Sequence, residues 1–163
     1  MHAMPILTIQ AAGNLLKALE DFLDKSEASF ALVIERGGSI LSQHGQIPPS
    51  TDPTVFAALA AGSFAATREL ALRVGETEFS ALYQQGQQSH ILISSVNEDS
   101  ALVTVFGPKT TLGLVRFYAV GAAKRIAVVL EQACQASQIP IDLSDSNILT
   151  GSWETFEEPA SRG

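Results

Sequence analysis

Residues 52–75 read DPTVFAALAAGSFAATRELALRVG and predict the clearest helix of the sequence. Asp52 can accept hydrogen bonds from the first free backbone N–H groups, Pro53 suits the first helical position, and Gly75 permits a left-handed stop. Between these limits, residues recur at helical spacing and predict one stripe that faces the core. The stripe comprises Phe56, Leu59, Ser63, Ala66 or Thr67, Leu70 and Val74.

The opposite side of this helix is poor in large and charged side chains. Small residues occupy it at Ala58, Ala61, Gly62 and Ala65, and polar residues appear only at Arg68, Glu69, Arg73 and Glu76. A solvated face normally carries more charge, whereas a face of small residues lets another backbone approach closely. Two interpretations stay open: burial inside one domain, or contact with a second copy of the chain and with a partner protein.

The composition favours one soluble, cytoplasmic domain. A chain of 163 residues that is 46% hydrophobic can bury one substantial core. A net charge of -7 argues against nucleic-acid partners and against anionic lipid. Cys134 is the only cysteine, so no intramolecular disulfide is expected. The N-terminus lacks the pattern of a signal peptide, and no window reaches about 18 consecutive apolar residues, so no membrane insertion is expected.

The remaining segments alternate between helical and strand-like patterns. A first amphipathic helix over about residues 8–26 carries an apolar stripe, and a last helix begins at Thr110 or Thr111 and ends near Ser137. The first stripe comprises Ala12, Leu15, Leu16, Leu19, Phe22 and Leu23, and the last comprises Leu112, Val115, Ala119, Ala122, Ile126, Val129 and Ala133.

Five strands are predicted between the helices. Residues 29–35 and 39–44 flank Arg36-Gly37-Gly38 as a hairpin, in which Phe30, Leu32 and Ile34 share one face and Ala31 and Val33 the other. Three further strands, at residues 79–85, 90–96 and 101–106, are joined by short turns and predict an antiparallel meander. The result is an α+β fold, a five-stranded antiparallel sheet with the middle helix on one face and the terminal helices on the other.

The C-terminal residues differ from the domain before them. We divide the chain into a domain at residues 1–136 and an acidic, partly amphipathic tail at residues 137–163. Apolar residues alternate with acids in this tail, which suits a segment that becomes ordered on an apolar groove. Trp153 and Phe156 are its candidate contact residues. The alternatives are a frayed tail, a tail that folds back on its own domain, and a tail that docks on a partner.

The sequence offers no constellation typical of an enzyme. His2, His44 and His90 are scattered without metal-ligand spacing, and no phosphate-binding loop or nucleophile elbow is present. We interpret Cys134 as an inert core or interface thiol. We therefore expect no catalytic site, metal or cofactor. A catalytic arginine acting on a GTPase accelerates hydrolysis roughly a thousandfold or more, but we interpret Arg68 and Arg73 as surface charges.

Particular stretches of the chain resemble a known family. They are LAAGSFAATRELALRVGETEF at residues 59–79, YQQGQQSHILISSV at 83–96, LVTVFGPKTTLGLVR at 102–116 and ALVIERGGSIL at 31–41. Together they cover about residues 26–136. The chain resembles the roadblock/LC7 (longin-like) domains, and among them the bacterial Mgl-type gliding regulators, homodimeric partners of a small Ras-like GTPase.

The resemblance implies a homodimer. In it the middle helices pack side by side, and the strand beginning near Phe79 pairs with its copy into one continuous sheet. That pairing would cover an apolar edge otherwise prone to aggregation. The implied dimer contacts are Leu59, Ser63, Phe79, Ala81, Leu82 and Tyr83.

The resemblance also implies a platform for the GTPase on the paired middle helices. Its implied contacts are Ala58, Ala61, Gly62, Ala65, Arg68, Glu69 and Leu72. Such regulators supply no catalytic arginine and instead reposition the groups of the GTPase. The leading hypothesis is therefore a GTPase-activating regulator that binds the GTP-bound form and shifts its switch regions. The alternative is a scaffold that joins a GTPase to a larger assembly without changing hydrolysis. The process served, motility, cell polarity or another, is left open.

Overall fold

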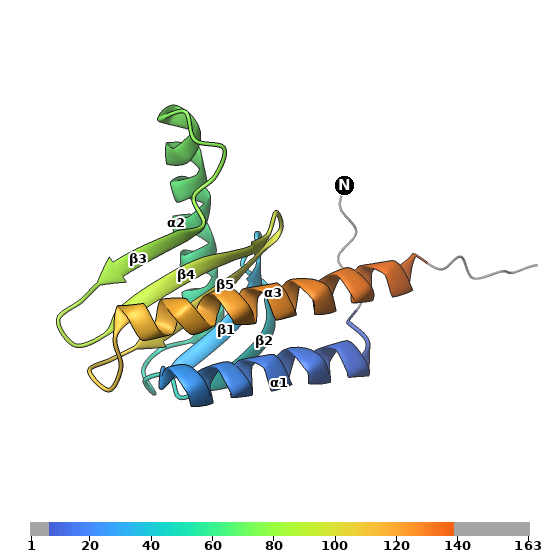
Figure 1. Ribbon diagram of the computed structural model, residues 1–163, viewed down its shortest axis with the longest axis horizontal. Coiled ribbons are helices and arrows are strands. Elements are labelled where there is room, and N and C mark those ends of the chain that lie inside the picture. Colours follow the sequence, from blue (N-terminus) through green and yellow to red (C-terminus); the bar gives the residue numbers. More distant parts are fainter. Residues whose placement is uncertain (1–6, 139–163) are drawn as a thin grey trace, which may run out of the picture.

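The computed structural model describes residues 7–138 and has the predicted order of elements (Figure 1). The helices are α1 (Ile9–Ser26), α2 (Pro53–Arg73) and α3 (Leu112–Ser137). The strands are β1 (Phe30–Glu35), β2 (Ile40–Gly45), β3 (Ala81–Gln85), β4 (His90–Asn97) and β5 (Ser100–Phe106). Of the predicted tail, nearly all, including Trp153 and Phe156, lies outside the described residues.

Each helix begins at the side chain that its sequence supplies. The Thr8 hydroxyl accepts from the Ala11 N–H, and the Asp52 carboxylate accepts from the Thr54 N–H at 2.9 Å. Of the two candidate caps for the last helix, Thr111 is the one used, because its hydroxyl accepts from the Leu114 N–H. Such caps satisfy backbone donors that the helix leaves free. The start of α2 predicted at Asp52 is therefore confirmed.

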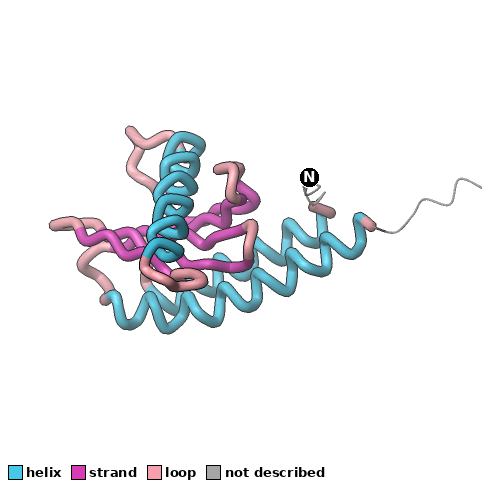
Figure 2. Tube along the Cα trace, turned by 90° about the horizontal axis from the view of Figure 1, so that it is seen from above, coloured by secondary structure: helices cyan, strands magenta, loops and turns pink. Residues whose placement is uncertain are grey.

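The five strands form one antiparallel sheet in the order β2-β1-β5-β4-β3. The first hairpin lies at one end of the sheet, and the meander returns so that its last strand pairs with β1. Both views show α1 and α3 running side by side and α2 crossing the strands (Figure 2). Strands β2 and β3 are thus the two edges of the sheet.

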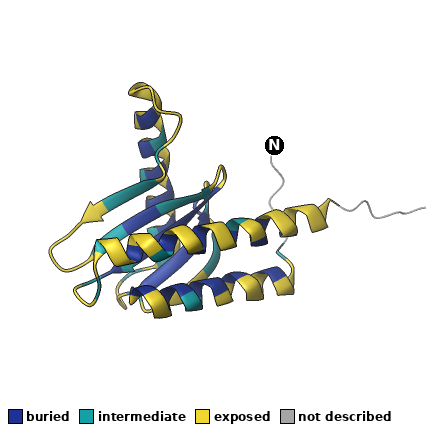
Figure 3. Cartoon of the chain, in the orientation of Figure 1, coloured by how far each residue is buried: buried dark blue, intermediate teal, exposed yellow. Residues whose placement is uncertain are grey.

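The sheet is buried on both faces, as the alternation along β1 predicts. Phe30, Leu32 and Ile34 pack toward α2, whereas Ala31 and Val33 pack toward the terminal helices. Buried residues accordingly concentrate on the central strands, and exposed residues lie on the outer sides of the helices (Figure 3). Strand β1 therefore separates two apolar clusters.

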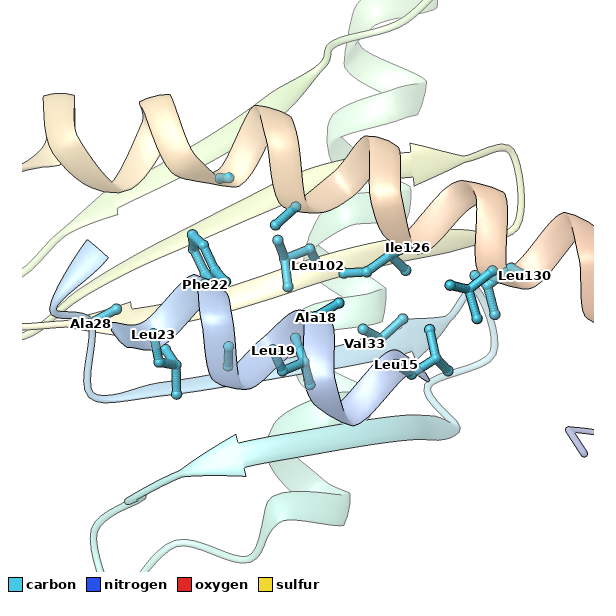
Figure 4. Close-up of a cluster of buried hydrophobic side chains, with 14 of the residues drawn as sticks. Leu15, Ala18, Leu19, Phe22, Leu23, Ala28, Val33, Leu102, Ile126 and Leu130 are labelled. Atoms are coloured by element: carbon cyan, nitrogen blue, oxygen red, sulfur yellow. The ribbon is translucent and has the colours of Figure 1, made fainter. Parts of the chain in front are cut away.

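The larger cluster joins α1 and α3 to the sheet. Leu19 and Ile126 have no exposed surface and lie among the side chains in Figure 4. Outside this cluster, Asp21 of α1 binds Arg125 of α3 at 2.7 Å and Lys17 at 3.3 Å. The hydrogen bond from Arg125 holds the pKa of the Asp21 carboxyl below its usual value. At neutral pH this carboxylate is ionised and bridges the two helices.

Two stripes of the terminal helices are close to their predictions. On α3 the buried residues include all the predicted ones except Leu112, which is half-buried. On α1, the predicted core residues Ala12 and Leu16 are exposed, and Ala11 and Ala18 are buried instead. Both alanines lie at the contact with α3, where Ala11 neighbours Ala133 and Ala18 neighbours Ala122.

The predicted core stripe of α2 is wrong at Leu59, Leu70 and Val74, whereas Thr67 is buried and Phe56 is half-buried against the sheet, as predicted. Leu59 is 67% exposed and Leu70 is 62% exposed, and Val74 is also exposed. The buried stripe consists of Ala57, Ala60, Ala61, Phe64, Thr67 and Ala71. The sheet beneath it already carries Phe, Leu and Ile side chains, so small helix residues bring the two layers into close contact. Periodicity misplaced the stripe because this helix is apolar on more than one side.

Gly38 occupies a position that the approach of α2 restricts. Its φ is +92°, and a Cβ built there would lie 2.9 Å from the Ala58 Cα. A left-handed backbone favours glycine, and the nearby helix backbone has no room to yield. This residue therefore fixes how the β1–β2 turn meets α2.

Replacing Gly38 with alanine is expected to lower the free energy of unfolding by about 1–3 kcal/mol, from backbone strain and the contact with α2. Gly37→Ala is the matched control, because its added Cβ meets nothing within 4 Å and no left-handed φ applies. We expect a change within about 0.5 kcal/mol for this control. Urea unfolding measures both, and equal losses would contradict the close approach of α2.

Candidate protein-interaction site

The exposed surface of α2 consists of two flanks on either side of its buried stripe. At 3.6 residues per turn, the exposed residues of α2 fall into two groups, one on each side of the buried stripe. We call them the small-residue flank and the leucine flank. The small-residue flank comprises Ala58, Gly62, Ala65, Glu69 and Leu72. The leucine flank comprises Val55, Leu59, Ser63, Ala66 and Leu70. Apart from half-buried Ser63, every member of both flanks is exposed.

The small-residue flank lies beside the turns of two hairpins. Ala58 packs next to Gly38 of the β1–β2 turn. Further along the helix, Ala65 and Arg68 line a cavity of about 20 Å³ together with residues of both the β1–β2 and β4–β5 hairpins. That volume holds about one water molecule, so the cavity cannot receive a small-molecule ligand. The small-residue flank is therefore an open surface beside the two hairpin turns, with no sizeable cavity in it.

Both arginines of α2 already have partners. The Arg68 guanidinium donates to the Glu98 backbone carbonyl at 2.7 Å, which ties α2 to the β4–β5 turn. Arg73 forms an ion pair with Glu69, one turn earlier, at 3.0 Å. Arg68 is thus oriented along the protein's own surface. This geometry fits the interpretation of these residues as surface charges.

Six of the seven predicted platform residues are accessible, and one is not. Ala61 is predicted on the outer face, but only 7% of it is exposed, because it packs on the sheet beside Phe64. Ala58, Gly62, Ala65, Glu69 and Leu72 share the small-residue flank, and Arg68 is half-buried at its border. The chain therefore brings these six together on one side of the helix.

The leucine flank lies outside the core, contrary to the prediction from the sequence. Leu59 and Ser63 are predicted both in the core and at a dimer contact, and the structure puts Leu59 outside the core. By length and composition, α2 is also apolar enough to cross a membrane. Its buried stripe packs on the sheet instead, and Arg68, Glu69 and Arg73 interrupt its last turns. The exposed leucines of α2 thus form an apolar strip beside its small residues.

Strand β3 is a free edge of the sheet. The Ser95 N–H donates to the Ser80 carbonyl, and hydrogen-bonded pairs alternate along an antiparallel ladder. The backbone groups of Ala81, Tyr83 and Gln85 therefore point away from β4. All three apolar residues of this strand are half-buried: Leu82 packs on the α2 side, and Ala81 and Tyr83 pack on the other.

Tyr83 is fixed by neighbours on the adjacent strands. Its hydroxyl lies 3.0 Å from the His90 Nδ1, and the His90 ring stacks on Phe106 with centroids 5.1 Å apart. Phe79, just before the strand, is half-buried. The predicted edge contacts Phe79, Ala81, Leu82 and Tyr83 thus follow one another along one edge of the sheet.

Within residues 7–138, no cluster of His, Cys, Asp and Glu could hold a metal ion. Cys134, interpreted from the sequence as a core or interface thiol, is exposed on α3, so the core assignment is wrong. The helix repeats apolar residues on more than one side near Cys134, and the buried position falls to Ala133 instead.

Fold and site together define a small protein-interaction domain with an open sheet edge and an exposed central helix. The chain belongs to the Roadblock/LC7 domain family, whose sequence model matches residues 15–106. That match begins within α1 and ends with β5. No curated protein matches the sequence.

Several solved structures share the fold. The gliding protein mglB from Thermus thermophilus is 28% identical, with a TM-score of 0.75 over 81% of this chain and 99% of that one. MglB from Myxococcus xanthus is 25% identical, with a TM-score of 0.72 over 78% and 96% of the two chains. An MglB structure with a tetrameric arrangement is 28% identical, with a TM-score of 0.76 over 82% and 99%.

Removing the Arg68 donor is expected to weaken the link between α2 and the β4–β5 turn. Arg68→Met keeps an apolar stem but loses the bond to Glu98, so the free energy of unfolding should fall by about 1 kcal/mol. Faster amide hydrogen exchange should appear at Asp99 and Ser100. The matched control is Arg73→Met, whose exposed ion pair contributes about 0.3–0.5 kcal/mol. Unchanged exchange in Arg68→Met would contradict the role of this contact.

Proposed function

We propose that the chain is a homodimeric, GTPase-activating regulator of a Ras-like GTPase, acting in the cytoplasm. The observation that carries the proposal is that α2 exposes two different flanks on opposite sides of its buried stripe. One helix can therefore contact a second copy through one flank and a partner through the other. Membership of the Roadblock/LC7 domain family and the similarity to MglB structures support this assignment.

The leucine flank and the β3 edge are the proposed dimer surfaces. Covering the exposed leucines of this flank with another apolar surface would lower the free energy of the complex. The β3 edge carries free backbone groups that a second β3 strand can satisfy in an antiparallel pair. Dimerisation through both would bring two α2 helices side by side above one continuous sheet.

The dimer is tested by Ala66→Arg. Ala66 is exposed between Leu59 and Leu70 on the leucine flank, so a long charged side chain there would hold two helices apart while leaving the protomer folded. We expect a dimer for the unmodified chain and a monomer for the variant in analytical ultracentrifugation. A monomeric unmodified chain, or an unaffected dimer in the variant, would contradict this interface.

The small-residue flank is the proposed platform for the GTPase. It carries the accessible residues of the predicted platform, and its small side chains allow the backbone of a partner to approach closely. Arg68 is tied to Glu98, which suits a regulator that supplies no catalytic arginine. On this proposal, binding of the GTP-bound form shifts the switch regions toward an arrangement competent for hydrolysis.

A scaffold is the second candidate function. It would use the same small-residue flank to join the GTPase to a larger assembly, leaving its hydrolysis rate unchanged. An MglB structure with a tetrameric arrangement supports this candidate, because it shows that a relative assembles beyond a pair. Phosphate release by the GTPase, measured with and without this chain, separates the two candidates.

Ala65→Arg tests the platform. Ala65 is exposed on the small-residue flank, and an arginine there would project into the space that a partner needs. We expect loss of binding to a Ras-like GTPase loaded with a non-hydrolysable GTP analogue, loss of accelerated phosphate release, and an unchanged dimer. Ala66→Arg, one residue further on, is the matched control that should affect the dimer first. Unchanged GTPase binding by Ala65→Arg would reject the platform.

A further inference from the structure

The sheet face that α3 shares with β3 and β4 carries an open groove. It has a volume of about 500 Å³ and runs between Ala81 and Val96 of the sheet and Val120 and Ala123 of α3. Helix α3 covers the sheet toward its centre, so β3 at the edge is left with little above it. The groove is lined largely by small side chains, which leaves room for large ones.

Two cations line this groove. Arg116 and Lys124 both come from α3, and both are exposed. They are separated by eight residues, which corresponds to about 12 Å along a helix. Neither forms an ion pair within residues 7–138. The groove therefore suits an extended segment that combines bulky apolar side chains with acids spaced about 12 Å apart.

Residues 153–158 of this chain have that chemistry. They read WETFEE, so Trp153 and Phe156 supply large apolar side chains and Glu154 and Glu158 supply acids. In an extended chain, positions four residues apart are separated by about 13 Å. This spacing matches that of the two cations on α3. The groove beside α3 and a segment with matching apolar side chains and opposite charges thus occur in the same chain.

The length of chain between α3 and this segment also fits. From Ser137 back to Lys124 the helix spans about 20 Å. A chain as long as residues 138–152 has a root-mean-square span of about 20 Å when it behaves as a flexible linker. A tether whose span matches the distance gives an effective concentration on the order of millimolar. A weak intrinsic affinity would then suffice for docking.

We propose that residues 153–158 dock in the groove between α3 and the β3–β4 edge of the same chain. Because side chains alternate along an extended chain, Phe156 faces α3 together with the two glutamates, which lie beside Arg116 and Lys124. Trp153 lies on the opposite side, over Ala81 of the β3 edge. The occupied groove lies next to the β3 edge. The docked tail would therefore cover a surface that is separate from both flanks of α2.

The test uses the fluorescence of Trp153, the only tryptophan in the chain. Compared with a synthetic peptide of residues 139–163, the full chain should show blue-shifted emission and weaker quenching by acrylamide. Arg116→Glu combined with Lys124→Glu should return both signals toward those of the peptide. The matched control, Lys25→Glu with Lys109→Glu, makes the same change in net charge at exposed sites outside this groove and should leave the signals unchanged.

Charge exchange provides the second measurement. Glu154→Lys with Glu158→Lys should also expose Trp153, and combining it with the groove reversals should restore the blue-shifted emission. Emission that matches the peptide in the unmodified chain would overturn the proposal, as would burial of Trp153 that ignores the groove charges. A blue shift that grows with protein concentration would assign the tail to a second copy and overturn docking within one chain.

Discussion

Close packing of α2 on the sheet is the constraint on which the rest of the structure depends. Four alanines, Phe64 and Thr67 form its buried stripe, and the strands below supply the bulky side chains. A helix that meets a sheet through small residues has little apolar bulk left to bury, so its leucines lie outside. The same approach favours glycine at position 38 of the β1–β2 turn. The alanines that pack α2 closely on the sheet are thus also the reason why its leucines are exposed.

Local signals in the sequence determined most of the fold. The caps at Asp52 and Thr111 are formed as expected, and alternation along β1 separates the two faces of the sheet correctly. These signals are local, because a cap or a pleat involves neighbours within a few residues. The burial of α2 was not predictable in this way. Two apolar stripes compete on that helix, and only the shape of the sheet beneath decides between them.

The candidate site was predictable in part. Most platform residues share a helix flank because sequence spacing alone fixes which residues lie on one side. The prediction that Ala61 is exposed was wrong, because its exposure depends on how α2 is rotated about its axis over the sheet. The contact between Arg68 and Glu98 joins residues thirty positions apart, and the groove beside α3 combines Ala81, Val96 and Val120. Such features arise from tertiary packing, which leaves no periodic signal in the sequence.

The backbone of β3 limits how a second strand can be added to the sheet. Its outward N–H and C=O groups come from every other residue, at Ala81, Tyr83 and Gln85, so an added strand can align only in steps of two residues. A slip of one residue would exchange the side chains above and below the sheet. Two sheets joined at β3 can therefore take only a few discrete relative positions, each set by one register of the added strand.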